Sequence, residues 1–195
     1  GDASGDTIDM TGAATPGMGN WDSDAYSNTT TIAGSVLTAI TSVDLDDDYL
    51  SGGITEVAKY KFVFDNGDNR ATTTDEAMKA QMQEVALTVS KTAGITADDW
   101  RAYFEGDSGN TSATSSSATI DLTTIPGDLE YVDGEVVLVV EANLSGVTEN
   151  DYFQTEINDL ASGDFTYDSN GVDAGGTVTN PRLDITRVTG DKLTN

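Results

Sequence analysis

Residues 56–65 read EVAKYKFVFD. An extended chain places alternate side chains on opposite faces, so Tyr60, Phe62 and Phe64 would share one face of a strand. Residues 135–141 (EVVLVVE) form the strongest strand pattern in the chain, and residues 31–43 (TIAGSVLTAITSV) are apolar on both faces, as in a strand buried between two layers. These stretches predict a core built from β-strands.

Shorter alternating patterns continue to the end of the chain. They occur at 85–89, 120–122, 153–157, 165–167 and 181–188, with turn-forming residues between them. Many short strands separated by turn signals are typical of a β-sandwich. The sequence also predicts one short helix near 74–84, after a capping box of Thr73 and Glu76, and a single helical turn at 97–101.

The fold class that we expect is therefore all-β, an Ig-like β-sandwich, with a jelly-roll-like arrangement as the alternative. Residues 1–20 are polar and contain Pro16 and several glycines, which predicts a flexible N-terminal arm. Residues 21–195 are expected to form a single β-sandwich domain.

The charge of the chain is strongly one-sided. It contains 9 basic and 34 acidic residues, a formal net charge of −25. Residues 1–58 and 102–181 contain no Lys or Arg, so salt bridges cannot neutralise most of the acidic field. Nucleic acid is excluded as a partner, because binding phosphates requires clustered Lys and Arg. Bound cations or saline surroundings would relieve the self-repulsion.

The sequence lacks several of the residue types on which catalysis commonly depends, and we predict that the chain is not an enzyme. Cys and His are absent, which excludes disulfides, Ser-His-Asp and Cys-His nucleophile systems, and ordinary zinc or copper sites. A pair of carboxylates could hydrolyse a glycoside, and such a hydrolase is the third hypothesis for function. No apolar stretch reaches about 18 residues, so no membrane insertion is expected.

Calcium is the cofactor that the acidic clusters favour, because Ca²⁺ binds carboxylate, amide and carbonyl oxygens. One predicted metal cluster lies around the loop after residue 65, and its candidate ligands are Asp65, Asn66, Asp68, Asn69, Asp75 and Glu76. The second consists of Asp44, Asp46 and Asp48. The alternative is that the Asn-Gly and Asp-Asn pairs form turns and that the acidic runs are solvated loops.

Three Asn-X-Ser/Thr sequons make Asn28, Asn110 and Asn143 candidate glycosylation sites, of which the first two fall in predicted loops.

The segment Thr7-Ile8-Asp9-Met10 alternates polar and apolar residues ahead of a Gly- and Pro-containing connector. Such a segment could add as a strand to the sheet edge of a neighbouring subunit, a head-to-tail contact that need not close into a ring. The alternative is a frayed terminus or an edge strand of the chain's own sandwich.

Four stretches, EVAKYKFVFDNGD (56–68), EVVLVVEANLSG (135–146), YFQTEIND (152–159) and PRLDITRVTG (181–190), resemble Ig-like sandwich subunits of prokaryotic surface structures. These are proteins of the S-layer, pilus and TasA-like biofilm-fibre type, and the resemblance covers residues 31–190. It implies an extracellular, assembling, non-catalytic protein. The start at Gly1 without Met, a basic stretch or an apolar stretch further suggests a mature form after signal-peptide removal, with a cloning scar as the alternative.

The first functional hypothesis is accordingly a self-assembling structural subunit of an extracellular filament or surface layer, a homopolymer joined by β-strand addition. The second is a calcium-dependent adhesion or carbohydrate-binding module that presents Trp21, Trp100 or the 106–118 loop to a glycan.

Overall fold

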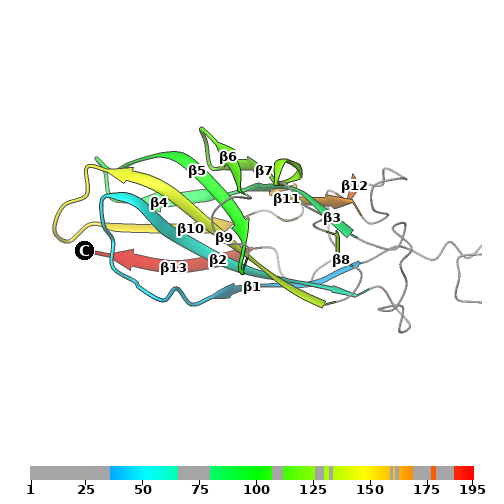
Figure 1. The fold of residues 1–195 in the computed structure, drawn as a ribbon. Coiled ribbons are helices and arrows are strands. Elements are labelled where there is room, and N and C mark those ends of the chain that lie inside the picture. The colour runs from blue at the N-terminus through cyan, green and yellow to red at the C-terminus, as the bar shows by residue number, and fades with distance from the viewer. Residues whose placement is uncertain are drawn as a thin grey trace, which may run out of the picture. The chain divides into compact units, whose positions relative to one another are not determined.

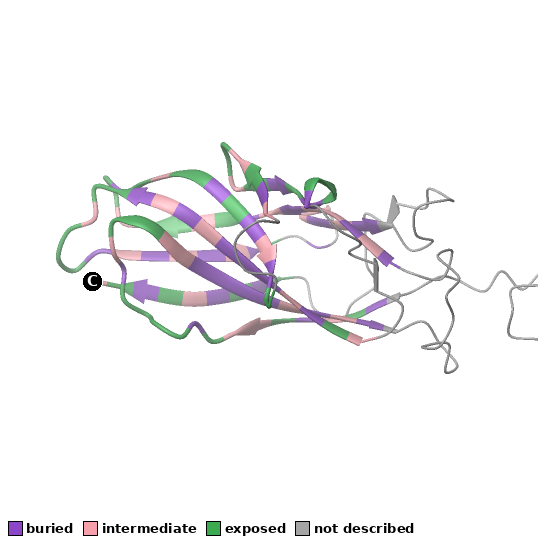
Figure 2. Ribbon diagram, in the orientation of Figure 1, coloured by how far each residue is buried: buried purple, intermediate pink, exposed green. Residues whose placement is uncertain are grey.

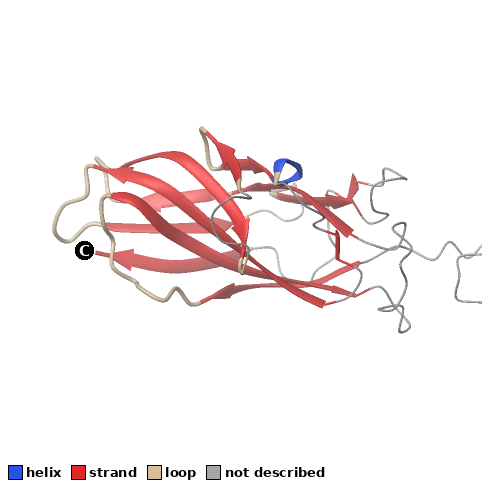
Figure 3. Ribbon diagram, in the orientation of Figure 1, coloured by secondary structure: helices blue, strands red, loops and turns tan. Residues whose placement is uncertain are grey.

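The computed structural model describes residues 36–65, 80–106, 112–125, 130–131, 134–158, 160, 163–168, 177–178 and 187–195. All of them fall within one unit, residues 34–195. The described residues of this unit form strands, loops and turns with a single 3₁₀ turn, drawn in blue in Figure 3, and they contain no α-helix. The all-β prediction is therefore confirmed, whereas the predicted arm 1–20 lies outside the described residues.

The first sheet has five strands in the order β1-β2-β9-β5-β6, and all neighbouring pairs are antiparallel (Figure 1). Its long central strands come from the aromatic and valine-rich stretches that dominate the sequence. The bounds are β1 Val36–Val43, β2 Gly53–Asp65, β9 Gly134–Ser145, β5 Thr96–Phe104 and β6 Ala113–Ser115.

The second layer consists of a three-stranded sheet, ordered β13-β10-β4, and a five-stranded sheet, ordered β12-β11-β3-β7 with β8 also paired to β3. β3 and β4 are separated by Leu87 alone, so one nearly continuous strand runs through both sheets. The bounds are β3 Ala80–Ala86, β4 Thr88–Lys91, β7 Thr119–Asp121, β8 Glu130–Tyr131, β10 Tyr152–Ile157, β11 Phe165–Asp168, β12 Thr177–Val178 and β13 Val188–Thr194. A 3₁₀ turn, η4 (Leu122–Thr124), follows β7.

Buried residues alternate with more exposed ones along the strands of both layers (Figure 2), and aromatic rings from the two layers pack against each other. Tyr60, Phe62 and Phe64 are each at most 1% exposed, which confirms that they share the inner face of β2. The ring of Phe62 lies 4.5 Å from that of Phe165 on β11. Phe64 meets Tyr167, also on β11, edge to face at 5.5 Å. Ring pairs of this kind add to the stabilisation from area burial alone.

Two buried tyrosine hydroxyls join the layers by hydrogen bonds. Tyr60 Oη lies 2.9 Å from Thr155 Oγ1 on β10, and both residues are fully buried. Tyr167 Oη accepts a hydrogen bond from the backbone N–H of Leu37 on β1 at 3.1 Å. Gly190 on β13 allows the close approach at the first bond, because a Cβ there would lie 3.1 Å from Tyr60 Oη.

The helix predicted near 74–84 is wrong over its described part, because residues 80–84 belong to strand β3. The rest of that segment lies outside the described residues. Met82 pairs with β11, the pairing shifts register at Gln83, and Val85 is the next buried side chain. This β-bulge places buried residues three positions apart, which imitates helical spacing. The helical turn predicted at 97–101 is also wrong, since these residues lie in β5.

The bounds of two other predicted strands differ from the elements that the structure describes. Ile120 lies in β7 as expected, but Leu122 already begins η4. The last predicted strand, 181–188, has only its final residues among those described. There, β13 starts at Val188 and continues to Thr194.

The chain changes layers between β6 and β7. β6 belongs to the first sheet, and after a bend at Ser116–Ala118 the chain enters the second layer as β7. β7 pairs with β3, and the carbonyl of Ala118 accepts a hydrogen bond from Leu87 N–H at 2.9 Å. Because the chain departs for the other sheet there, β4 pairs only with β10 among the described residues.

Candidate functional site

A β-bulge in β5 shapes the surface of the first sheet. Asp98 pairs with Asn143 and Arg101 pairs with Glu141, so the two residues between them face a single residue of β9. Asp99 takes the left-handed backbone conformation, with φ of 50°. Asp tolerates this conformation better than most residues do. Bulges are frequent beside binding sites, because they redirect a side chain.

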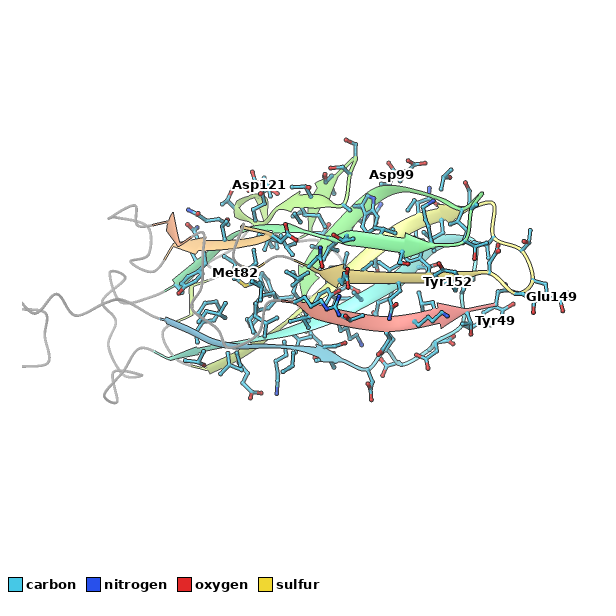
Figure 4. The ribbon with its side chains drawn as sticks, turned by 180° about the vertical axis from the view of Figure 1, so that it is seen from behind. Tyr49, Met82, Asp99, Asp121, Glu149 and Tyr152 are labelled. Atoms are coloured by element: carbon cyan, nitrogen blue, oxygen red, sulfur yellow. The ribbon has the colours of Figure 1, made fainter. Side chains whose placement is uncertain are left out.

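The bulge forms one side of a shallow surface depression of about 500 Å³. Figure 4 shows Asp99 at the surface of the molecule on β5. β6 and the bend after it form the other side of the depression. The lining residues are Asp99, Trp100 and Arg101 from β5, with Thr114, Ser115 and Ser116 from β6 and the bend.

Several polar groups of the depression are already bonded and hold its shape. The Oδ2 atom of Asp99 accepts a hydrogen bond from Asn143 Nδ2 at 3.4 Å. The hydroxyl of Ser115 donates to the carbonyl of Thr119 at 2.7 Å and accepts from Ser117 N–H at 3.1 Å. The bulge and the bend are therefore each fixed by hydrogen bonds of their own.

Arg101 is exposed and forms no ion pair with any acidic side chain that the structure describes. Among the basic residues that the structure describes, only Lys59 and Lys61 form ion pairs. The depression therefore offers a free guanidinium close to a carboxylate and several hydroxyls. The hypothesis of a carbohydrate-binding module named Trp100 and the 106–118 loop, which contains Thr114, Ser115 and Ser116, but it did not name Asp99 or Arg101. The adjacent acids Asp98 and Asp99 interrupt the apolar alternation and were the signal that could have located the bulge.

Trp100 lies at the floor of the depression but does not present its ring. It is 2% exposed and packs toward Phe153 of β10, with ring centroids 6.3 Å apart. The expectation that Trp100 faces a glycan is therefore wrong. Trp21 and residues 107–111 of the 106–118 loop lie outside the described residues.

A second cluster lies on the outer face of the same sheet, around Lys59. Its ammonium group is 3.2 Å from carboxylate oxygens of Asp46 and Glu56 and 3.6 Å from Glu105, and its side chain is 7% exposed. Burial lowers the pKa of Lys59, but hydrogen bonds to Asp46 and Glu56 raise it more, so the net shift is upward. One ammonium group is thus shared among three carboxylates, of which those of Asp46 and Glu105 are largely exposed.

Tyr103 lies on the same outer face and donates a hydrogen bond to Glu141 Oε1 at 3.1 Å. Burial, followed by the negative charge of Glu141, raises the pKa of Tyr103 to about 12. Burial also raises the pKa of Tyr60 in the core, well above that of an exposed tyrosine.

The acidic segment 44–48 runs beside β13 and is held there by hydrogen bonds. Leu45 N–H donates to Asp191 Oδ2 at 2.7 Å, and the Asp48 carbonyl accepts from Thr194 N–H at 3.0 Å. Leu45 is buried, Asp44, Asp46 and Asp48 are exposed, and Asp46 pairs with Lys59. Within the described ranges, no three acidic side chains gather closely enough to hold a metal ion. The Ca²⁺ prediction for Asp44, Asp46 and Asp48 stays a prediction.

The other predicted sites fall mostly where the structure gives no description. Asp65 is the last residue of β2, while Asn66, Asp68, Asn69, Asp75 and Glu76 lie outside the described residues. The same holds for the Thr7–Met10 assembly strand and for Asn28 and Asn110. Asn143 lies within β9, between β2 and β5, and is half-buried.

The open edge of β4 is the second surface feature with functional potential. Thr92 N–H bonds to the Tyr152 carbonyl at 3.0 Å, which fixes the alternation of the ladder with β10. The backbone groups of Thr88 and Ser90 then face β10, and those of Val89 and Lys91 face outward. An outward row of N–H and C=O groups can pair with another strand.

Comparison with protein-family models, curated proteins and solved structures finds no match for this chain. Among the described residues, no helix is long and apolar enough to cross a membrane.

Proposed function

We propose that the chain is a structural subunit that assembles with copies of itself by adding a strand of one copy to the β4 edge of the next. The observation that carries this proposal is the outward-facing backbone of Val89 and Lys91, for which no described strand provides a partner. Four strand residues are enough to receive a short segment such as Thr7–Met10. In accord with this role, we place the assembly at a prokaryotic cell surface.

The side chains along β4 specify which way an added strand would run. Val89 pairs with buried Thr155 and packs against the core, so the added strand needs an apolar residue beside it. Lys91, two positions on, has the same orientation, and its ammonium donates to the carbonyl of Ile95. A basic group on the core side of an edge disfavours unselective pairing.

An antiparallel strand from the N-terminal segment of a second copy would place an apolar residue beside Val89 and an acidic residue beside Lys91. If Ile8 lies opposite Val89, then Asp6 lies opposite Lys91. An apolar residue thus faces an apolar one and an acid faces the base. A parallel strand in the same position would instead place Met10 opposite Lys91 and leave its charge without a partner. Charge pairing across the contact would contribute to register and specificity.

Disulfide trapping tests the assembly and its register together. The chain has no cysteine, so Ile8→Cys and Val89→Cys introduce the only thiols. Residues opposite each other in a hydrogen-bonded antiparallel pair lie about 5.5 Å apart at Cα, a distance that a disulfide spans. Under mild oxidation, we expect a ladder of covalent oligomers on a denaturing gel from the doubly substituted chain.

The matched control places the second cysteine one residue away, as Ile8→Cys with Ser90→Cys. Its side chain points to the opposite face of the sheet, so oligomer yield should fall strongly. Particles of unmodified protein, viewed by negative-stain electron microscopy, report assembly independently of register. Filaments without the covalent ladder would reject this register. Isolated particles under all conditions, including added Ca²⁺, would reject the function.

A further inference from the structure

We propose that the depression formed by β5 and β6 binds a neutral saccharide unit, with Asp99 and Arg101 as its principal contacts. This site is separate from the β4 edge, and the inference does not depend on assembly. It rests on which hydrogen-bonding groups of the depression remain free, and on the charges that those groups carry.

The free groups include donors and acceptors. Asp99 uses Oδ2 for Asn143, which leaves Oδ1 as an acceptor. Arg101 has no described ion-pair partner and retains its donors. Thr114 and Ser116 are exposed, and each hydroxyl can donate and accept. A ligand that fits these groups must itself donate to a carboxylate and accept from a guanidinium. The hydroxyl groups of a sugar do both.

The opposite charges of Asp99 and Arg101 disfavour both anionic and cationic ligands. A carboxylate or phosphate would pair with Arg101 but would face the Asp99 carboxylate and the net charge of −25. A cation would pair with Asp99 but would face the guanidinium of Arg101. A neutral polyhydroxy compound meets neither repulsion, and both charged groups strengthen its hydrogen bonds.

The site is preorganised, which lowers the entropic cost of binding. Asn143, on the neighbouring strand β9, holds the carboxylate of Asp99 from the side. The hydroxyl of Ser115 fixes the bend after β6 through its bonds to Thr119 and Ser117. Because Trp100 is buried beneath the depression, its ring is not available to stack on the sugar, and we expect half-saturation in the millimolar range for a single sugar unit.

The experiment is a titration of the full-length ¹⁵N-labelled chain with glucose, galactose, mannose and N-acetylglucosamine, followed by amide chemical shifts. Galacturonic acid and glucosamine, at matched pH and ionic strength, serve as the anionic and cationic comparators. We expect at least one neutral sugar to shift the amides of residues 98–101, 114–116 and 143 in a saturable way. Both charged analogues should bind about tenfold more weakly.

Two substitutions remove the proposed contacts with little change in shape. Asp99→Asn keeps a side chain that tolerates the left-handed backbone, and Arg101→Met keeps the aliphatic stem. Each should weaken the binding of the neutral sugar about tenfold. Lys61→Met, which removes a basic group paired with Glu135 on the same sheet, should leave it unchanged. If Arg101→Met melts early, Ser116→Ala on the exposed bend replaces it and should weaken binding severalfold.

The proposal is overturned if none of the four neutral sugars shifts these amides, or if the shifts fall on another surface. It is also overturned if galacturonic acid binds as tightly as the neutral sugars, because Arg101 would then act as an anion site. Tight binding of glucosamine that Asp99→Asn abolishes would equally reject the neutral class.

Discussion

Replacing Tyr60 with Phe should destabilise the chain by about 1–3 kcal/mol. The substitution keeps the ring in the core but removes the hydroxyl that lies 2.9 Å from Thr155 Oγ1. Both residues are fully buried, so water cannot replace the lost partner, and the hydroxyl of Thr155 is left unsatisfied. The desolvation cost of such an orphaned group exceeds the net gain from a typical hydrogen bond.

A double-mutant cycle with Thr155→Val isolates the bond. Each single substitution leaves one buried hydroxyl without this partner, whereas the double substitution removes both. The double variant should therefore be less destabilised than the sum of the two single variants by about 1 kcal/mol. Urea unfolding measures this from the shift in midpoint at constant m-value. Tyr152→Phe is the control, with an expected change within about 0.5 kcal/mol, because the Tyr152 hydroxyl has no hydrogen-bond partner among the described residues.

Additive effects of Tyr60→Phe and Thr155→Val would refute this reasoning, because two groups that form one bond cannot contribute independently. An effect of Tyr60→Phe no larger than that of the control would show that the inter-layer bond does not contribute to stability.

Three further predictions follow from other features. The raised pKa values of Tyr60 and Tyr103 mean that the folded chain keeps protons that the unfolded chain releases near pH 10. The contribution of these two groups to stability is therefore complete below that pH and should fall between about pH 10 and 12. A urea series across this range, repeated with Tyr103→Phe, should show a smaller loss for the variant. Gly146→Ala should lower the free energy of unfolding by at least about 2 kcal/mol in the same assay, because Gly146 has φ of 76° and a Cβ there would overlap the Gly94 carbonyl. Gly52→Ala is the control and should have a smaller effect, because the added Cβ would make only an ordinary contact. Raising NaCl from about 0.1 to 1 M should increase the melting temperature, because salt screens the repulsion within a chain of net charge −25. A melting temperature that does not change with salt would show that this repulsion does not limit stability.

The sequence predicted the fold class because the longest strands keep a strict alternation. Tyr60, Phe62 and Phe64 alternate without interruption, and they form the inner face of β2. The sequence failed where a bulge interrupts the alternation. At Gln83 and at Asp99 an extra residue interrupts the alternation, and both segments were predicted as helical, the first because of its capping box at Thr73 and Glu76.

The candidate sites were harder to predict, because they depend on which strands pair with each other and where a sheet ends. Arg101 and Thr114 are cross-strand neighbours only because β5 and β6 pair. The open edge of β4 depends on where the chain leaves for the other sheet, after Ser115. Neither feature can be recognised from the local composition. Acidic clusters can be recognised in this way, but their role cannot: Asp46 forms an ion pair with Lys59, and composition does not distinguish this role from metal binding.

The pairing of β2 with β9 has a consequence for how the chain folds. β1 and β2 are adjacent in sequence and can form a hairpin early. The other edge of β2 can pair only after β9 is in place, and β9 follows β3 to β8 in the chain. Closing such a long loop must precede most of the stabilisation that the core provides, and proteins dominated by distant pairings fold in milliseconds to seconds. In that interval, the aromatic face and free edge of β2 would be open to other chains. Because every copy carries the same large net charge, electrostatic repulsion would oppose association of these intermediates until β9 pairs with β2.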